Sequence, residues 1–340
     1  MALWPAWRPG ATNSRIRFSL FKDEMTRFTA KRLGTKPIIH PGLAQTIGTN
    51  INGPSAIRVP DWIKAPLGRY YLYFADHRGD HVRLAHADAI TGPWRVHEPG
   101  ALRLEGSGFP TLSKELDPPE RLRESVATGD LRPHIASPDV HVDQARRQIV
   151  MHYHGLEIDC TQTTRRAVSG NGLEFRDPQP TGADFYARVF EWQGVTYAAT
   201  LAGWLYRSPD SGQTFTGRTR LGDPATRHVA VFPFGDQLFL VFSRIGDAPE
   251  RLLISRVLTT GSWRSWRLSD PRELLRAETP WEGAGQPVSP SHTGPADEPV
   301  NQLRDPHVLS EGNHLWLFYA CAGESGLALA QLNRSGSDRE

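Results

Sequence analysis

The sequence predicts an all-β fold, a five-bladed β-propeller whose ring is closed by a strand near the N-terminus. Five strongly apolar or aromatic segments recur along the 340 residues. Each lies within a unit of three or four short strands, and the units repeat at about 40–50 residues, as propeller blades do. The chain carries 31 Gly and 27 Pro, which suits a sheet protein with many tight turns.

The strongest segment of each unit is rich in β-branched and aromatic residues and follows a short turn. We expect these second strands at residues 70–74, 149–153, 195–199, 238–242 and 315–319. A shorter first strand precedes each, at 55–59, 139–142, 187–191, 228–232 and 306–309. Third strands are expected at 82–85, 165–168, 204–207, 252–255 and 327–330, and fourth strands at 94–96, 173–175, 214–216 and 263–266.

The fifth unit has no fourth strand of its own because the chain ends soon after its third. A ring with a missing strand would leave an open edge, so we expect residues 27–32 to supply it. Residues 26–334 then form a single domain, with polar, Pro/Gly-rich insertions at 101–133 and 268–302. Residues 335–340 form a tail. Residues 1–25 form an extension, either poorly ordered or a short ordered arm, with Met25 as the alternative physiological start.

A local motif supports the propeller. Residues 208–215, Ser-Pro-Asp-Ser-Gly-Gln-Thr-Phe, match the Asp-box of sialidase-like propellers, and 169–175 form a degenerate copy. The motif is a turn device in which the Asp side chain bonds nearby backbone and Gly adopts positive φ. We therefore expect Asp210 to be structural and not catalytic.

The bulk properties exclude several classes of protein. The net charge is +2, with 39 basic and 37 acidic residues interspersed, which argues against a nucleic-acid-binding surface. No run approaches the ~20 apolar residues that cross a bilayer, and no secretory signal is evident. Cys160 and Cys321 are far apart and have no metal-ligand spacing. We expect a cytoplasmic protein without membrane or nucleic-acid partners; the oligomeric state is not predicted.

Polar residues gather at equivalent positions of the units. In a four-stranded blade, the start of the inner strand and the loop between strands two and three face the same end of the central funnel. Both kinds of position carry carboxylates, Arg and His in this chain. Polar groups lining a narrow funnel are satisfied by one another or by a ligand, so we expect a site at this mouth.

The opening blade contains four short segments that matter for comparison: Lys-Pro-Ile-Ile at 36–39, Gly-Arg-Tyr-Tyr-Leu-Tyr-Phe at 68–74, Arg-Leu-Ala-His-Ala-Asp at 83–88 and Gly-Pro-Trp at 92–94. Together they resemble the opening blade of five-bladed arabinanase- and xylosidase-type family-43 glycoside hydrolases. Arg304-Asp305-Pro306 is similar to the family's Arg-Asp-Pro, whose Asp is the catalytic base. The resemblance spans residues 36–332 and implies a sugar-cleaving propeller.

The family carries a base Asp, a pKa-tuning Asp and a general-acid Glu on consecutive blades, and this chain departs from that order. Asn52-Gly53 stands where the base is expected on the first blade. Glycoside hydrolysis needs two carboxyl groups in different environments. We predict Asp305 as base, Asp139 as the second carboxylate and Glu250 as proton donor. Glu324 and Glu282 are the rivals for the donor.

The remaining polar residues of the predicted rim are expected to bind an oligosaccharide. They are Asn52, His77, His154, Arg188, His228, Arg244, Arg304 and Glu324. No catalytic metal or other cofactor is predicted, because no pair of the 13 histidines has a metalloprotease or zinc-finger spacing; a structural metal on the funnel axis stays open.

Two alternative functions remain open from the sequence. One is a lyase on uronate sugars, in which His77, His154 or Tyr186 moves the C5 proton and Arg188 or Arg244 neutralises the carboxylate. The other is a non-catalytic carbohydrate- or protein-binding propeller, which the loss of an acid at Asn52-Gly53 favours.

Overall fold

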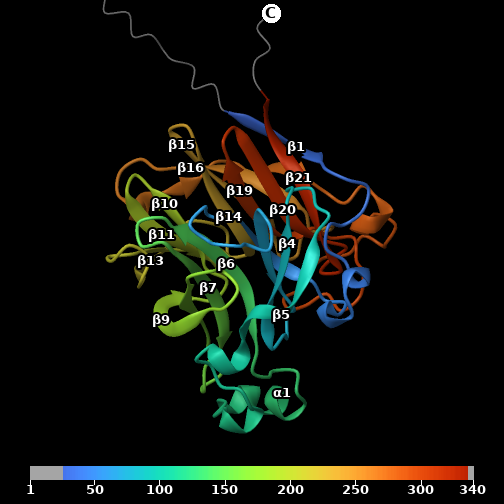
Figure 1. Ribbon diagram of the computed structural model, residues 1–340. Helices are drawn as coiled ribbons and strands as arrows, with labels where there is room; N and C mark the ends of the chain where they lie inside the picture. The colour runs from blue at the N-terminus through green and yellow to red at the C-terminus, as the bar shows by residue number, and fades with distance from the viewer. Residues whose placement is uncertain (1–25, 336–340) are drawn as a thin grey trace, which may run out of the picture.

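The computed structural model describes residues 26–335 and shows five antiparallel sheets arranged as a wheel (Figure 1). The predicted extension at 1–25, with Met25, and residues 336–340 of the predicted tail lie outside the described residues. Inner strands β6, β14 and β19 lie near the middle of Figure 1, and β1, β5, β9 and β13 lie towards the rim. The predicted five-bladed propeller is confirmed.

Each blade consists of strands that are consecutive in the chain. Blade one is β2 (Asn52–Arg58), β3 (Tyr70–Ala75), β4 (His81–Ala87) and β5 (Arg95–Arg103). Blade two is β6 (Ile135–Asp143), β7 (Gln148–Leu156), β8 (Gln162–Ser169) and β9 (Arg176–Asp184). Blade three is β10 (Arg188–Trp192), β11 (Val195–Thr200), β12 (Trp204–Arg207) and β13 (Thr216–Arg220). Blade four is β14 (Thr226–Phe234), β15 (Gln237–Arg244), β16 (Leu252–Leu258), β17 (Arg267–Leu268) and β18 (Arg272–Leu275).

Blade five combines the two ends of the described chain. It contains β19 (Arg304–Glu311), β20 (His314–Cys321) and β21 (Gly326–Ser335), and its outer strand is β1 (Arg27–Arg32). β1 runs antiparallel to β21, from Arg27 opposite Ser335 to Arg32 opposite Ala330. The N-terminal strand thus covers an edge that would otherwise expose unpaired backbone groups.

The outer strands of three blades begin later than the sequence suggested. Phe175 and Phe215, which were assigned to strands, end Asp-box turns and are buried at 7% and 2% exposure; β9 and β13 start just after them. Residues 263–265 form a 3₁₀ turn in place of a strand. The apolar signal at these positions comes from side chains anchoring a turn to the core, whereas the true outer strands are mostly polar.

The Asp-box interpretation is confirmed. Asp210 accepts hydrogen bonds from the backbone N–H groups of Gln213 and Thr214, and Ser208 Oγ accepts one from Gly212 N at 2.7 Å. Asn171 takes the place of the Asp in the degenerate copy. Asp210 therefore holds a turn, as expected.

Apolar side chains fill the five interfaces between neighbouring sheets, but unequally. Four clusters hold thirteen or more buried apolar residues each. The cluster between blades two and three holds only five, among them Tyr206 and Phe215. This interface therefore has the smallest apolar core of the five.

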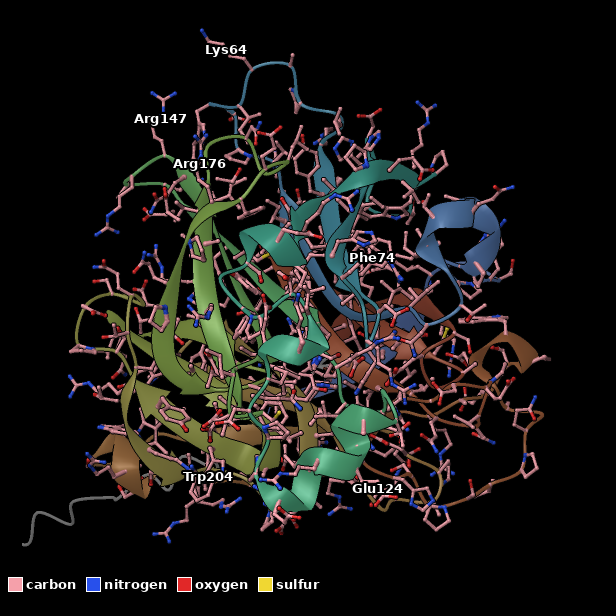
Figure 2. The ribbon with its side chains drawn as sticks, turned by 90° about the horizontal axis from the view of Figure 1, so that it is seen from below. Lys64, Phe74, Glu124, Arg147, Arg176 and Trp204 are labelled. Atoms are coloured by element: carbon pink, nitrogen blue, oxygen red, sulfur yellow. The ribbon has the colours of Figure 1, made fainter. Side chains whose placement is uncertain are left out.

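The two ends of the wheel differ in their connections. The insertion between blades one and two contains the short helix α1 (Arg123–Ala127), and Glu124 lies at the same end as Trp204, where inner strands begin (Figure 2). Lys64 and Arg147 mark the opposite end, where loops join first strands to second strands. We call these the mouth end and the hairpin end. No helix among residues 26–335 is long and apolar enough to span a membrane.

Candidate active site at the mouth of the channel

The inner strands share a backbone irregularity where they enter the channel. The register with the second strand shifts between Asn52 and Ser55, between Ala136 and Asp139, and between Arg304 and His307. A residue with left-handed φ lies at or beside the equivalent position of four blades: Gly53 (+59°), Ser137 (+49°), Tyr186 (+59°) and Asp305 (+50°). Such bulges re-aim side chains and are frequent next to active sites.

Asp305 occupies this bulge in blade five and is 1% exposed. Its Oδ2 accepts a hydrogen bond of 3.1 Å from the backbone N–H of Gly53, across the junction with blade one. Its Oδ1 contacts Nδ1 of His228 from blade four. A carboxylate at φ +50° is tolerated because Asp adopts the left-handed region more readily than most residues.

Three aromatic rings form a row beside Asp305. Tyr186 lies between His154 and His228, with ring centroids 4.3 and 4.2 Å away and near-perpendicular planes. Burial and, second, the charge of Arg227 hold the pKa of His228 well below its usual range. Burial and then the charge of His134 do the same to the pKa of His154. Both imidazoles are therefore neutral near pH 7.

Tyr186 keeps its proton. Burial, followed by the negative charge of Glu324, raises the pKa of its phenol above the usual range. Nε2 of His228 and Nδ1 of His154 have no hydrogen-bond partner among the described residues. Buried polar atoms without partners are rare in native proteins and call for a ligand or ordered water. The row therefore offers unsatisfied groups to a polar molecule.

Four charged side chains of alternating sign contact one another on the other side of the mouth: Arg227, Glu250, Arg304 and Glu324. Glu250, fully buried, accepts hydrogen bonds at Oε1 from Arg227 Nε (2.8 Å) and Ser243 Oγ (2.7 Å). Its Oε2 lies 3.4 Å from Arg304 Nε. Arg304 also donates from NH1 to Oε1 of Glu324 at 3.0 Å. A carboxylate placed between two guanidinium groups suits a positioning role and disfavours the proton-donor role predicted for Glu250.

Glu324 joins blade five to blade one. Its Oε2 accepts hydrogen bonds from Asn50 Nδ2 (2.7 Å) and Asn52 Nδ2 (3.1 Å), and His77 Nδ1 lies 3.6 Å away. Burial alone would raise the pKa of Glu324, but the hydrogen bond and charge of His77 and the charge of Arg304 lower it below its usual range. Glu324 is therefore ionised near neutral pH.

Asp139 does not lie at the level of Asp305, contrary to the expectation that both line the rim. It is two residues further along its strand than Ser137, the counterpart of Asp305, which is roughly 7 Å deeper at a strand rise of ~3.3 Å. Its Oδ2 accepts from Val189 N at 2.7 Å, and Arg188 NH1 lies 3.4 Å from Oδ1. Arg188 itself donates to the carbonyls of Pro138 and Pro54.

Asp139 is held as an anion. Burial would raise its pKa, but the charge and hydrogen bond of His141, and then the charge of Arg188, lower it well below the usual range. Arg188 and Asp139 thus form a buried pair inside the channel, below the mouth.

Two predicted residues lie apart from the cluster. Arg244 pairs with Asp247 at 3.4 Å in the loop after β15, and no hydrogen bond joins it to Asp305, Glu250 or Glu324 among the described residues. Glu282 is bonded by Arg32 Nε and Tyr319 Oη, both at 2.8 Å, and so ties β1 to the second insertion. Glu282 is structural in this arrangement because both partners belong to the ring closure.

Sequence reasoning missed Asn50 as a member of the site, and Arg227 was not among the predicted binding residues. Asn50 bonds Glu324, Asn52 and the backbone N–H of His77. The alternation Asn50-Ile51-Asn52 was the available signal, since two amides two residues apart share one side of an extended chain. Arg227 directly precedes His228 in a short polar pair at a strand start.

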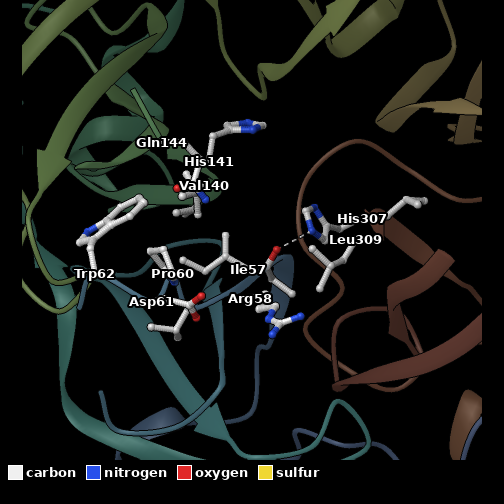
Figure 3. Close-up of a pocket in the computed structure, with 14 residues that line it drawn as sticks. Ile57, Arg58, Pro60, Asp61, Trp62, Val140, His141, Gln144, His307 and Leu309 are labelled. Carbon is white, nitrogen blue, oxygen red and sulfur yellow. Dashed lines mark hydrogen bonds between the residues drawn. The ribbon is translucent and has the colours of Figure 1, made fainter. Parts of the chain in front are cut away.

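A separate pocket of about 450 Å³ lies at the hairpin end (Figure 3). Trp62, His141 and Leu309 line it from three blades, with His307 bonded to the carbonyl of Ala56 at 3.1 Å. It lies at the ends of inner strands, away from Asp305.

A viral protein is similar in sequence to this chain over most of its length. An uncharacterized protein of Acanthamoeba polyphaga mimivirus is 34% identical over 310 residues, covering 83% of each chain. The chain belongs to the family of that viral protein. No family model matches it.

Several solved structures share the fold. A family-43 glycoside hydrolase of Xanthomonas citri aligns with TM-score 0.56 at 12% identity, covering 91% of this chain and 93% of that one. A β-xylosidase/α-arabinofuranosidase from a compost metagenome, crystallised with xylotriose, aligns with TM-score 0.56 at 11% identity over 92% and 97%. An α-L-arabinanase of Cellvibrio cellulosa aligns with TM-score 0.51 at 10% identity over 84% and 91%. The architecture is therefore that of the family-43 propellers, as the sequence suggested.

Proposed function

We propose that this protein is a glycoside hydrolase that cleaves short oligosaccharides at the mouth of the channel, with Asp305 as the base that activates water. The observation that carries the proposal is the placement of Asp305. It is a buried carboxylate at a left-handed bulge of an Arg-Asp-Pro segment, in a fold that known glycosidases use. It contacts His228, whose Nε2 has no hydrogen-bond partner among the described residues.

The shift of the base from blade one to blade five has a steric rationale. A Cβ at Gly53 would lie 3.0 Å from the Cα of Ser137, and Gly53 has φ +59°, so a longer side chain at this point of blade one would be crowded and strained. The carboxylate of Asp305 instead reaches the backbone N–H of Gly53 from the neighbouring blade. A carboxylate therefore still lies beside blade one, but it belongs to β19 of blade five.

The second catalytic group must hold a proton near neutral pH. Glu324 and Asp139 are unsuited because both have lowered pKa values. Glu250 is occupied by Arg227 and Arg304. Tyr186 lies against His228, which contacts Asp305, and its phenol carries a proton. Because burial raises the pKa of this phenol, it would release the proton only as negative charge develops on the leaving oxygen. We therefore assign Tyr186 as the group that protonates the leaving oxygen, in place of the predicted Glu250.

The substrate-binding roles proposed for the remaining mouth residues follow their positions. Asn52, His77 and Arg304 gather polar atoms around Glu324. His154 belongs to the row of rings that reaches Asp305 through His228. We assign these residues to binding the hydroxyl groups of the sugar. Xylose- and arabinose-containing oligosaccharides are the first substrates to test because the structural neighbours include a xylosidase and an arabinanase.

A uronate lyase remains the second candidate, and the row His154–Tyr186–His228 favours it because a phenol between two neutral imidazoles suits proton transfer at carbon. The arginines argue against it. Arg188 and Arg244, which were predicted to neutralise a uronate carboxylate, are paired with Asp139 and Asp247. Arg227 and Arg304 at the mouth are likewise paired with Glu250 and Glu324, so a uronate carboxylate would have to displace an anion.

The test separates these functions. Aryl xylosides, aryl arabinofuranosides and uronate oligosaccharides are incubated with the protein, and released phenol, new reducing ends and absorbance near 235 nm are followed. Hydrolysis that releases phenol without 235 nm absorbance supports the proposal. An unsaturated product supports the lyase, and binding without turnover supports a lectin-like propeller.

A further inference from the structure

We propose that Asp139, His141 and His152 form a site for one divalent transition-metal ion between blades two and three. One ligand atom from each residue lies within 4.8 Å of the others. Asp139 and His141 are two residues apart on β6, and His152 is the cross-strand partner of Asp139 on β7. All three side chains therefore project from the same face of blade two, which is the geometry that a facial set of three ligands needs.

His152 is oriented as a metal ligand before any ion binds. It is 3% exposed, and its Nε2 lies 3.4 Å from the carbonyl oxygen of Gly212 in the Asp-box of blade three. Its Nδ1 has no hydrogen-bond partner among the described residues. A backbone carbonyl that accepts one ring N–H fixes the tautomer and leaves the other nitrogen with its lone pair free, as in many metal-bound histidines.

Asp139 is fixed in the same way. The backbone N–H of Val189 donates to Oδ2 at 2.7 Å, and Arg188 approaches Oδ1 at 3.4 Å. Partners of this kind orient a carboxylate ligand and preserve its charge. His141 is the adjustable member, because its side chain is 40% exposed and its Nε2 lies 2.7 Å from Asp139 Oδ2. A modest rotation of the His141 ring would let its Nε2 and Oδ2 of Asp139 bind the same ion.

An ion could reach the three ligands from solvent through a cleft between blades two and three. The interface between blades two and three has the smallest apolar cluster of the five. A cleft of about 700 Å³ opens there, and His141 and His152 line it together with Gln213. Ligand molecules or water could complete the coordination from this cleft.

The donor set selects the class of metal. Two imidazoles and one carboxylate suit zinc and its first-row neighbours, whereas calcium and magnesium prefer oxygen-only sites. Tetrahedral zinc with bonds of about 2.0–2.1 Å needs ligand atoms about 3.4 Å apart, so the cluster would contract on binding. Three protein ligands leave one position of a tetrahedral zinc ion open.

The site is separate from the mouth, since its residues do not contact Asp305. The metal proposal therefore does not depend on the proposed hydrolysis.

The competing explanation is an ion pair between Asp139 and His141 that needs no metal. Chelator-treated full-length protein is titrated with Zn²⁺ by calorimetry and with Co²⁺ by visible absorption, which reports nitrogen coordination directly. We expect one ion per chain. His152→Ala and His141→Ala should each weaken binding at least tenfold, while His314→Ala, an exposed histidine of blade five, should bind as the unmodified protein does.

Folding of each variant is checked by circular dichroism. His141→Ala serves as the safer variant because its side chain is half exposed, whereas His152→Ala opens a buried space. Absence of stoichiometric Zn²⁺ binding, or equal affinity in His141→Ala and His314→Ala, would overturn the proposal and leave the ion pair as the explanation.

Discussion

Replacing Asp305 by Asn tests the proposed base with little structural change. The amide is isosteric, and its oxygen can keep the 3.1 Å hydrogen bond from Gly53 N. Asn also tolerates φ +50°, whereas Ala would add roughly 1–2 kcal/mol of backbone strain. The substitution therefore removes the negative charge and the proton-accepting ability and keeps the shape.

The expected loss is set by the role of a general base. Such a group contributes about 10²–10⁴-fold, so kcat on an aryl glycoside should fall by that factor, or about 3–5 kcal/mol in the barrier. The free energy of unfolding should change by less than about 2 kcal/mol because the buried hydrogen bond survives. Initial rates of phenol release and urea denaturation measure the two quantities.

The chain offers a matched control in Asp177→Asn. Asp177 also precedes a proline and has φ +57°, but it is exposed and lies at the start of β9, beside Arg176 and away from the mouth (Figure 2). This variant should keep full activity. Unchanged kcat in Asp305→Asn, or an equal loss in Asp177→Asn, would refute the assignment of Asp305.

Three further predictions concern two residues of the mouth and one residue that lies apart from it. Glu324→Gln should lower the free energy of unfolding by about 1–3 kcal/mol at pH 7. Because the pKa of Glu324 is lower in the folded protein than in the unfolded chain, this difference should narrow as urea denaturation is repeated at increasingly acidic pH, and a difference that stays constant would contradict the prediction. Tyr186→Phe should leave the melting temperature nearly unchanged but reduce kcat about 10²-fold or more, and full activity would remove Tyr186 as proton donor. Glu282→Gln should destabilise the fold by about 1–3 kcal/mol in urea, through the bonds to Arg32 and Tyr319, with kcat unchanged; a selective loss of kcat would return Glu282 to the active site.

The inner three strands of each blade could be predicted because burial on both faces demands apolar sequence. Tyr70–Ala75 and Gln237–Arg244 illustrate this with runs of aromatic and β-branched residues. Outer strands such as Thr216–Arg220 carry mostly polar side chains, so their signal is weak. The aromatic residues nearby, such as Phe215, belong to turns, which drew the prediction a few residues too early.

The membership of the mouth was more predictable than the roles within it. Equivalent strand positions identified Asp305, His228 and Arg304 because propeller geometry brings strand starts together. The placement of Asp139 below the mouth depends on a bulge at Ser137, and no sequence pattern fixes such a bulge. The pairing of Glu250 with Arg227 and Arg304 depends on the side-chain rotamers of residues from two different blades. A local sequence pattern does not determine those rotamers.

The most direct test of the proposed function is the crystal structure of Asp305→Asn soaked with xylo- and arabino-oligosaccharides. The account predicts sugar at the mouth end, with the bond to be broken between residue 305 and Tyr186. Sugar in the hairpin-end pocket beside Trp62, or at the mouth but out of reach of residue 305, would contradict it.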